Sequence, residues 1–335
     1  MAAKVRLGLI GCGGIMHAHA GHLADIKSAE VVALVDPSRA SLRRLLARFP
    51  ALSGLPTFAD YEDMLESVDL DGVIIATPHT LHYQQIMTCL DHGLHVLTEK
   101  PLVCRVDHAK DVMRKARRKQ RLLMIAYQRH FFPAFRQARQ ILASGKLGRV
   151  TFVAALQAQE WLRFTKGTWR QDPDLSGGGQ LNDSASHLLD IMLWVTDLVP
   201  ETVFAQIDNR GAKVDILSSL TVRFKGGAIG SLAVVGDAPS WWEEITFYGE
   251  KGALYLRNDR LHLQTSPPNA TSNDVTGRLR YRGNVDKNFV DSILGRDEPQ
   301  TPPIWGLRVI QLTEAAWESA RLGRPVKAKP QGRAR

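Results

Sequence analysis

Short apolar runs alternate with amphipathic segments through the first third of the chain. The runs have the length and the β-branched content of buried strands, and the segments between them have the three-to-four-residue spacing of amphipathic helices. Buried strands separated by helices predict a parallel sheet with helices on both faces. The predicted strands are residues 4–10, 31–36, 71–77, 94–99 and 121–126, and the predicted helices are residues 17–26, 38–49, 60–66, 81–92 and 106–119.

The pattern changes after residue 126. Alternating apolar and polar positions now recur in neighbouring runs that are joined by short turns, which predicts a mostly antiparallel sheet. The strands predicted there are residues 149–159, 202–208, 216–224, 228–236, 244–250 and 253–258. The helices predicted there are residues 133–144, 184–195, 284–294 and 304–322.

A chain of 335 residues suits two domains. We therefore predict an α/β protein whose N-terminal domain, residues 1–126, is a doubly wound parallel sheet. The C-terminal domain, residues 127–335, is predicted to be α+β, with a large, mostly antiparallel, open-faced sheet.

Composition narrows the class of protein. Hydrophobic residues make up 44% of the chain. No apolar run approaches the length of about 20 residues that spans a bilayer. The N-terminus lacks the layout of a signal peptide. We therefore expect a cytoplasmic protein without a membrane partner. The three cysteines, Cys12, Cys89 and Cys104, have no metal-type spacing and are expected to be reduced thiols.

The net charge is +9, and part of the excess lies at residues 114–121 and in the tail, residues 327–335. Such clusters can bind nucleic acid. Neither cluster is interleaved with aromatic residues or matches a DNA-binding motif, so we interpret them as a solvated helix end and a tail. No nucleic-acid partner is expected.

The first predicted strand leads into "GLIGCGGIMHAHA", which nearly spells the dinucleotide fingerprint G-x-G-x-x-G. Gly11 and Gly13 hold the positions that make the tight turn and approach the pyrophosphate, whereas Met16 replaces the glycine that packs helix against strand. The pyrophosphate would meet the N-terminus of the helix that begins near Gly14 and Ile15. The loop alone is a weak signal, because glycine turns after strands are common.

The second predicted strand ends on Asp36, 23 residues after Gly13. A carboxylate there can accept hydrogen bonds from the adenosine ribose and repels a 2′-phosphate, which favours NAD over NADP. Arg39 lies close enough to leave NADP open. An alternative role for Asp36 is that of N-cap for the following helix.

Three further motifs follow in order. A strand ends in Thr-Pro-x-x-x-His, the next ends in Glu-Lys-Pro, and a glycine-rich segment in the second half leads into Asp-x-x-x-His. With the G-C-G-G-I-x-x-x-H loop and the final "ESARLGRPV", they resemble the Gfo/Idh/MocA family (glucose–fructose oxidoreductase, inositol dehydrogenase and relatives) over nearly the whole chain. The matching residues are His19, Thr77, Pro78, His82, Glu99, Lys100, Pro101, Asp183 and His187.

The resemblance implies an NAD(P)-binding Rossmann domain followed by a substrate-binding and oligomerisation domain, with a homodimer or homotetramer as the expected assembly. It also implies hydride transfer between a nicotinamide cofactor and a secondary hydroxyl of a sugar, sugar derivative or cyclic polyol. The cofactor-binding residues it implies are Gly11, Gly13, Gly14, Ile15, Asp36, Thr77, Pro78, His82, Glu99 and Lys100.

The implied reaction assigns catalytic roles to Lys100, Asp183 and His187. A histidine beside a carboxylate can exchange a proton near neutral pH, so His187 is assigned as the general base in oxidation and the general acid in reduction. Asp183, four residues earlier at the start of a helix, would share its face and either orient His187 or hold a substrate hydroxyl. The positive charge of Lys100 would stabilise a developing alkoxide.

Arginine and tryptophan side chains near these motifs suit the recognition of hydroxyl groups and ring faces. The expected substrate-binding residues are Lys100, Arg129, Trp169, Arg170, Asp183 and His187, and Trp161 and Arg163 are further candidates.

Other functions stay open at this point. The pairs His79/His82 and Asp183/His187 have metal-ligand spacing, but no cysteine or third carboxylate accompanies them, so no metal is expected. A hydrolase built on Ser184 or Ser186 would lack a nucleophile elbow. An enzyme that retains NAD during glycoside elimination or epimerisation would use the same residues, and a non-catalytic nucleotide-sensing or sugar-sensing regulator would not need them.

Overall fold

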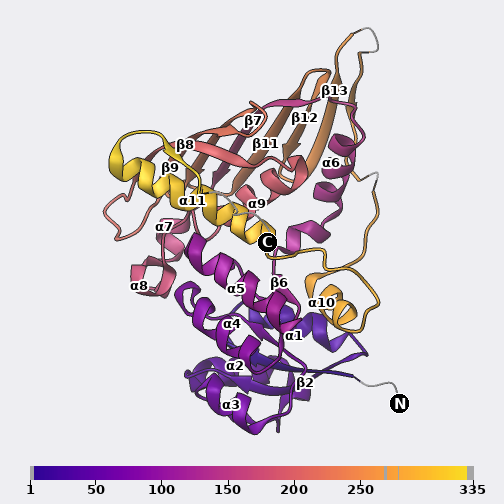
Figure 1. The fold of residues 1–335 in the computed structure, drawn as a ribbon, viewed down its shortest axis with the longest axis vertical. Helices are drawn as coiled ribbons and strands as arrows, with labels where there is room; N and C mark the ends of the chain where they lie inside the picture. Colours follow the sequence, from indigo (N-terminus) through magenta and orange to yellow (C-terminus); the bar gives the residue numbers. More distant parts are fainter. Residues whose placement is uncertain (1–3, 268–269, 278, 330–335) are drawn as a thin grey trace. The chain divides into compact units, whose positions relative to one another are not determined.

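The computed structural model describes residues 4–267, 270–277 and 279–329, so the last six residues of the basic tail lie outside the described part. The chain forms two compact units (Figure 1). The first unit contains the chain up to residue 103 together with residues 107–128 and 283–303. The second unit contains residues 104–106, residues 129–282 and the chain from residue 304 onward.

The first unit is built on a parallel six-stranded sheet with the strand order β3-β2-β1-β4-β5-β6. This confirms the predicted doubly wound parallel sheet. The strands are β1 (Val5–Ile10), β2 (Ala29–Val35), β3 (Thr57–Phe58), β4 (Gly72–Ile75), β5 (His95–Thr98) and β6 (Leu123–Ile125). The helices are α1 (Met16–Ala24), α2 (Arg39–Arg48), α3 (Tyr61–Ser67), α4 (His82–Asp91), α5 (Val106–Lys119) and α10 (Val285–Ile293).

The central strands of this sheet are apolar on both faces because helices cover both. Leu7 and Leu9 on β1, Ile74 on β4 and Leu97 on β5 have no exposed surface. Burial on both faces of a parallel sheet accounts for the continuous apolar runs in the sequence. Since β1 and β4 are neighbours in the sheet, the chain segments that follow them emerge at the same edge.

The second unit is built on a nine-stranded sheet with the order β14-β13-β12-β11-β7-β10-β9-β8-β15. Among the strands that the structure describes in this sheet, only the β7–β10 pair is parallel, which confirms the predicted mostly antiparallel sheet. The strands are β7 (Val150–Ala158), β8 (Pro200–Asp208), β9 (Leu217–Phe224), β10 (Ile229–Val235), β11 (Trp242–Gly249), β12 (Gly252–Arg257), β13 (Arg260–Thr265), β14 (Ser272–Asp274) and β15 (Val326–Lys327). The helices are α6 (Pro133–Ala143), α7 (Trp161–Phe164), α8 (Pro173–Ser176), α9 (Ala185–Thr196) and α11 (Ile304–Leu322).

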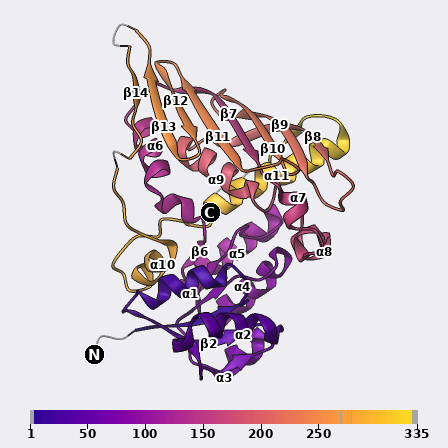
Figure 2. The ribbon, with the colours of Figure 1, turned by 180° about the vertical axis from the view of Figure 1, so that it is seen from behind.

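One face of the large sheet carries the core of the second unit. Helices α6, α9 and α11 lie on that face, as the two opposite views show (Figures 1 and 2). Ile245 and Phe247 of β11 point into this core and have no exposed surface. On the opposite face Trp242 and Tyr248 keep 43% and 41% of their surface exposed, so the sheet is open on that side.

No helix in the described ranges combines the length and the apolar character that crossing a bilayer requires.

Candidate functional site

The glycine loop after β1 combines one tightly packed glycine with two open ones. Gly11 has a φ of +88°, and a Cβ there would lie 2.6 Å from the Ala76 carbonyl oxygen. A Cβ at Gly13 or Gly14 would meet nothing within 4 Å. Gly11 is therefore required by the fold, whereas Gly13 and Gly14 leave open space beside the loop.

The N-terminus of α1 faces that space with unused donors. Among the described residues, no hydrogen bond employs the N–H groups of Gly13, Gly14 and Ile15. The Met16 side chain has no exposed surface, so it lies in the core rather than in the open space. Free N–H groups at a helix N-terminus, with room beside them, fit a pyrophosphate.

Asp36 ties the glycine loop to the end of β2. Its Oδ2 accepts the Cys12 N–H at 2.7 Å, and its Oδ1 accepts the Ser38 N–H at 2.7 Å. Ser38, and not Asp36, is the N-cap of α2, since the Ser38 hydroxyl accepts the N–H of Ser41. The alternative role of Asp36 as N-cap was therefore wrong. Each carboxylate oxygen has a second lone pair, which leaves Asp36 able to accept hydrogen bonds from ribose hydroxyls.

His82 joins the loops that follow β4 and β5. The side chain has no exposed surface. Its Nδ1 lies 2.8 Å from the Pro101 carbonyl oxygen, and its Nε2 lies 3.1 Å from the Thr77 carbonyl oxygen. Burial lowers the pKa of His82, although both carbonyl contacts oppose this. His82 thus connects the Thr-Pro-x-x-x-His motif to the Glu-Lys-Pro motif from within the protein.

The Glu-Lys-Pro motif begins directly after β5, at the carboxyl end of the parallel sheet. The Glu99 side chain is 8% exposed, and its Oε2 accepts the Lys100 N–H at 3.1 Å. The peptide bond between Lys100 and Pro101 is cis. Ligands of doubly wound sheets bind outside the carboxyl ends of the strands, which is the edge where Lys100 lies.

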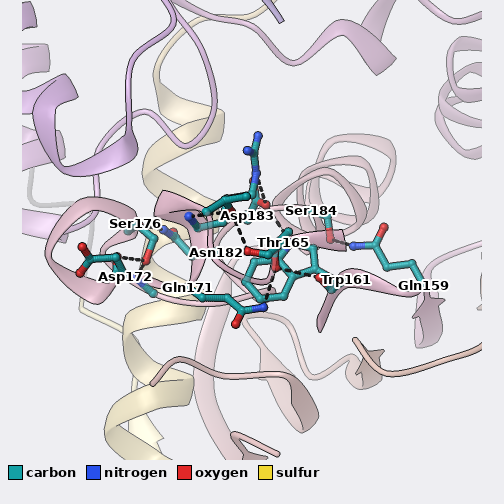
Figure 3. A network of polar contacts seen from close by, with 12 residues as sticks. Gln159, Trp161, Thr165, Gln171, Asp172, Ser176, Asn182, Asp183 and Ser184 are labelled. Carbon is teal, nitrogen blue, oxygen red and sulfur yellow. Dashed lines mark hydrogen bonds and ion pairs between the residues drawn. The ribbon is translucent and has the colours of Figure 1, made fainter. Parts of the chain in front are cut away.

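In the second unit, Asp183 is a buried carboxylate with two donors fixed on one oxygen. Asp183 Oδ2 accepts the indole N–H of Trp161 at 2.8 Å and lies 3.0 Å from Nε of Arg170 (Figure 3). The Asp183 side chain is only 6% exposed. The Thr165 hydroxyl donates to the Trp161 carbonyl and accepts from the Gln171 amide, which ties the end of α7 to the residue after Arg170.

The glycine-rich segment before Asp183 is shaped by a second buried carboxylate. Asp215 accepts the N–H groups of Gly179 and Leu181, both at 2.8 Å, and the indole N–H of Trp317 at 3.0 Å. Burial raises the pKa of Asp215, and these donors counteract the rise. A Cβ at Gly179 would lie 2.0 Å from the Asp215 carbonyl oxygen, so the close approach requires glycine.

His187 lies in the first turn of α9, which begins at Ala185. Asp183 lies in the turn just before the helix, and its expected pairing with His187 stays a prediction. Ser184, the residue between Asp183 and the helix, accepts a hydrogen bond from Gln159 and donates one to Gln157 at 3.2 Å. The segment that carries Asp183 is therefore fastened to β7 on one side and to Trp161 and Arg170 on the other.

Arg129 is held by a buried carboxylate. Its Nη1 lies 2.7 and 2.8 Å from the two carboxylate oxygens of Glu243, and Glu243 also accepts from Gln157 at 3.0 Å. Because Gln157 bonds to Ser184 as well, Arg129 belongs to the same polar network as the segment that carries Asp183.

The other candidate substrate-binding residues lie around α7. The Arg170 guanidinium lies over the Trp169 ring, 4.5 Å from its centre. Arg163 pairs with Glu160 and lines an open cavity of about 610 Å³ together with Gln171.

Several of the residues that shape these sites carried no signal in the sequence. Asp215, Glu243 and Asp286 accept hydrogen bonds from, or contact, residues that lie 34 to 267 positions away, and no local pattern marks them. Within the described ranges, no group of three or more histidine, cysteine, aspartate or glutamate side chains is arranged to hold a metal ion.

Comparison with known proteins identifies the family. Residues 5–127 match the profile of an oxidoreductase family with an NAD-binding Rossmann fold, and residues 135–255 match the Gfo/Idh/MocA C-terminal domain. The chain is 31% identical to the rhizopine catabolism protein MocA of Rhizobium meliloti, over 59% of each chain. It is 26% identical to glucose-6-phosphate 3-dehydrogenase of Bacillus subtilis, over 61% of this chain and 57% of that protein.

The alignments with the first curated relatives cover 46 to 59% of their lengths. Among solved structures, the WlbA dehydrogenase of Bordetella pertussis, in complex with NADH and UDP-GlcNAcA, superposes with a TM-score of 0.85 at 24% identity. That superposition covers 98% of this chain and 99% of WlbA, and it establishes the shared fold. The chain belongs to the Gfo/Idh/MocA family of oxidoreductases.

Proposed function

We propose that this protein is an NAD-dependent oxidoreductase that transfers a hydride between nicotinamide and a secondary hydroxyl or keto group of a sugar, sugar derivative or cyclic polyol. One observation carries the proposal. The open, donor-rich loop of the first unit is accompanied in the second unit by a buried Asp183 carboxylate, locked in place four residues before His187.

The relatives support the substrate class. One is named for dehydrogenation of a phosphorylated glucose, and WlbA is described with NADH and a nucleotide-linked sugar acid. The side chains around Asp183 fit such ligands, because arginine and the aromatic faces of tryptophan bind hydroxyl groups and sugar rings.

The first unit would hold the cofactor. The N–H groups of Gly13, Gly14 and Ile15 would receive the pyrophosphate, and Asp36 would accept hydrogen bonds from the adenosine ribose. Thr77, Pro78 and Glu99 would line the rest of the site, and His82 would keep their loops in register from the interior. The Asp36 carboxylate would disfavour the 2′-phosphate of NADP.

The bound NAD supplies the hydride acceptor in oxidation. The protein then has to take the hydroxyl proton and stabilise charge on the reacting oxygen. We assign the proton to His187 and the stabilisation to the ammonium group of Lys100. Asp183 would hold a substrate hydroxyl or favour the imidazolium form of His187 with its fixed negative charge. In reduction the same groups would act in reverse.

We further propose that the open face of the large sheet joins copies of the chain into a dimer or tetramer. Trp242 and Tyr248 are 43% and 41% exposed there, and large exposed aromatic side chains favour protein–protein contact. Sedimentation velocity would test this assembly. A monomer at micromolar concentration would contradict it.

A substrate screen tests the activity. Binding of NADH and NADPH would be followed by fluorescence, and a panel of sugars, polyols and their keto forms would then be screened for absorbance change at the nicotinamide band. Lys100→Met should lower turnover by at least about 100-fold while NADH affinity stays within several-fold. The exposed Lys27→Met is the matched control and should keep full turnover. An unchanged rate in Lys100→Met would contradict the assignment, and a wild-type protein that binds no dinucleotide would contradict the proposed function as a whole.

A further inference from the structure

A buried cluster of charged side chains lies behind the Glu-Lys-Pro motif of the first unit. His19 of α1 lies between two carboxylates: its Nδ1 is 2.5 Å from Asp286 of α10, and its Nε2 is 3.3 Å from Glu99. The side chains of His19 and Glu99 are 4% and 8% exposed, and Asp286 is fully buried. All three belong to the first unit, since the chain returns to that unit at residues 283–303.

The contacts of His19 determine its charge. A neutral imidazole has one N–H, so one of its nitrogens would direct a lone pair at a carboxylate oxygen. A protonated imidazole donates to both carboxylates. Burial lowers the pKa of His19, but Asp286 and Glu99 outweigh this effect and raise it to about 10. His22, half exposed on the next turn of α1, contacts the other oxygen of Asp286 at 2.6 Å, and His19 lowers the pKa of Asp286 in return.

We propose that His19 is a positioning residue of the dinucleotide site. Its imidazolium, anchored by Asp286, fixes the Glu99 carboxylate. Glu99 accepts the Lys100 N–H and so fixes the start of the loop that carries Lys100. The inference rests on the proposed function, in which Glu99 and Lys100 serve the cofactor and the reacting oxygen. It assigns α10 a role in that function, because α10 supplies the Asp286 counter-ion.

The charges around the cluster are complementary. Asp286 and Glu99 supply two negative charges, and the positive charge of His19 lies between them. His22 of α1 also contacts Asp286, and the Lys100 N–H contacts Glu99. The charge of Glu99 raises the pKa of the buried His82, and the charge of Lys100 lowers it. Removal of the Asp286 charge would leave Glu99 as the sole anionic partner of His19 in the described part of the chain. The imidazolium would then lose its proton at a lower pH, and Glu99 would lose its donor.

The pH dependence of NADH affinity tests the proposal. The wild-type dissociation constant should stay within about twofold between about pH 6 and about pH 9, because His19 keeps its proton throughout. In Asp286→Asn the constant should rise about tenfold over the same range, as His19 becomes neutral. In His19→Asn it should be high and independent of pH. Asp286→Glu, which keeps the carboxylate, should restore the flat profile.

Two controls separate this role from a purely structural one. His92→Asn removes an exposed histidine at the end of α4. Any change of NADH affinity with pH that this variant shares with wild type comes from groups other than His19. An Asp286→Asn profile parallel to wild type would overturn the proposal, even where affinity falls equally at every pH. If that variant does not fold, the ¹⁵N shifts of the wild-type His19 ring decide, and a neutral ring at about pH 8 would overturn the proposal. Failure of wild type to bind NADH would instead refute the proposed function.

Discussion

Asp36, at the end of the neighbouring strand β2, holds the backbone of Cys12, with 2.7 Å between its Oδ2 and the Cys12 nitrogen. The carboxylate therefore shapes the glycine loop as well as presenting an acceptor at the end of β2. Replacement by serine should lose both effects. We expect Asp36→Ser to weaken NADH binding about tenfold and to lower the preference for NADH over NADPH, since the repulsion of the 2′-phosphate disappears. Fluorescence titration with both dinucleotides measures this, and the exposed Asp25→Ser is the control. Unchanged discrimination would contradict the role of Asp36.

Gly11 and Gly13 should respond differently to the same substitution. Gly11→Ala places a Cβ against the Ala76 carbonyl at a φ of +88°, so it should destabilise the fold by about 1–3 kcal/mol. Gly13→Ala meets no protein atom within 4 Å and should leave the Tm unchanged. Its methyl group would occupy the space proposed for the pyrophosphate, so NADH affinity should fall at least about tenfold. Thermal melts and NADH titrations separate the two effects. Full affinity in Gly13→Ala would place the cofactor elsewhere.

Asp183 and Trp161 offer a graded test of the second unit. Asp183→Asn removes the charge that contacts Arg170, and we expect turnover to fall at least about 100-fold. Trp161→Phe removes only the indole donor to Asp183, so we expect a loss of roughly tenfold. Steady-state rates with a substrate found in the screen provide the comparison, and Trp241→Phe, at an exposed ring, is the control. A greater loss in Trp161→Phe than in Asp183→Asn would show that packing of the ring matters more than the carboxylate.

The raised pKa of His19 also affects stability. The folded-state pKa of about 10 lies above the ordinary histidine pKa of 6.5, so the stabilisation is complete below about pH 6.5 and is lost as the pH rises through about 10. The Tm advantage of wild type over His19→Asn should therefore be largest near neutral or mildly acidic pH and shrink toward about pH 10. An advantage that grows with pH would show that His19 is neutral in the folded protein.

The regular elements could be predicted because apolar residues recur along the chain at the spacing of a strand or of a helix. The apolar runs of β1 and β4 reflect a sheet buried on both faces, and α5 was predicted with the bounds that the structure gives. The elements that were missed lacked such a signal. Strand β3 has two residues, and α7 and α8 have four each.

The site residues also divide into those that the sequence could predict and those that it could not. Motif residues such as Gly11, Lys100 and Asp183 stood out because their local sequence is distinctive. Their supporting residues did not, because the His19–Asp286 contact joins positions 267 apart and depends on the return of the chain to the first unit. Long-range ion pairs leave no periodic pattern, so only the folded structure shows that two carboxylates share one histidine.

The most direct test of the central claim is a double-mutant cycle on single-turnover hydride transfer. The claim is that Lys100 and His187 act on the same substrate oxygen in one transition state. Rates would be measured at the nicotinamide band for wild type, Lys100→Met, His187→Asn and the double variant, with cofactor and substrate saturating. Groups that act as a unit give strongly non-additive losses, so the double variant should be slower than the worse single variant by no more than about tenfold. If the two losses multiply in full, the residues act independently and the proposed catalytic arrangement is wrong.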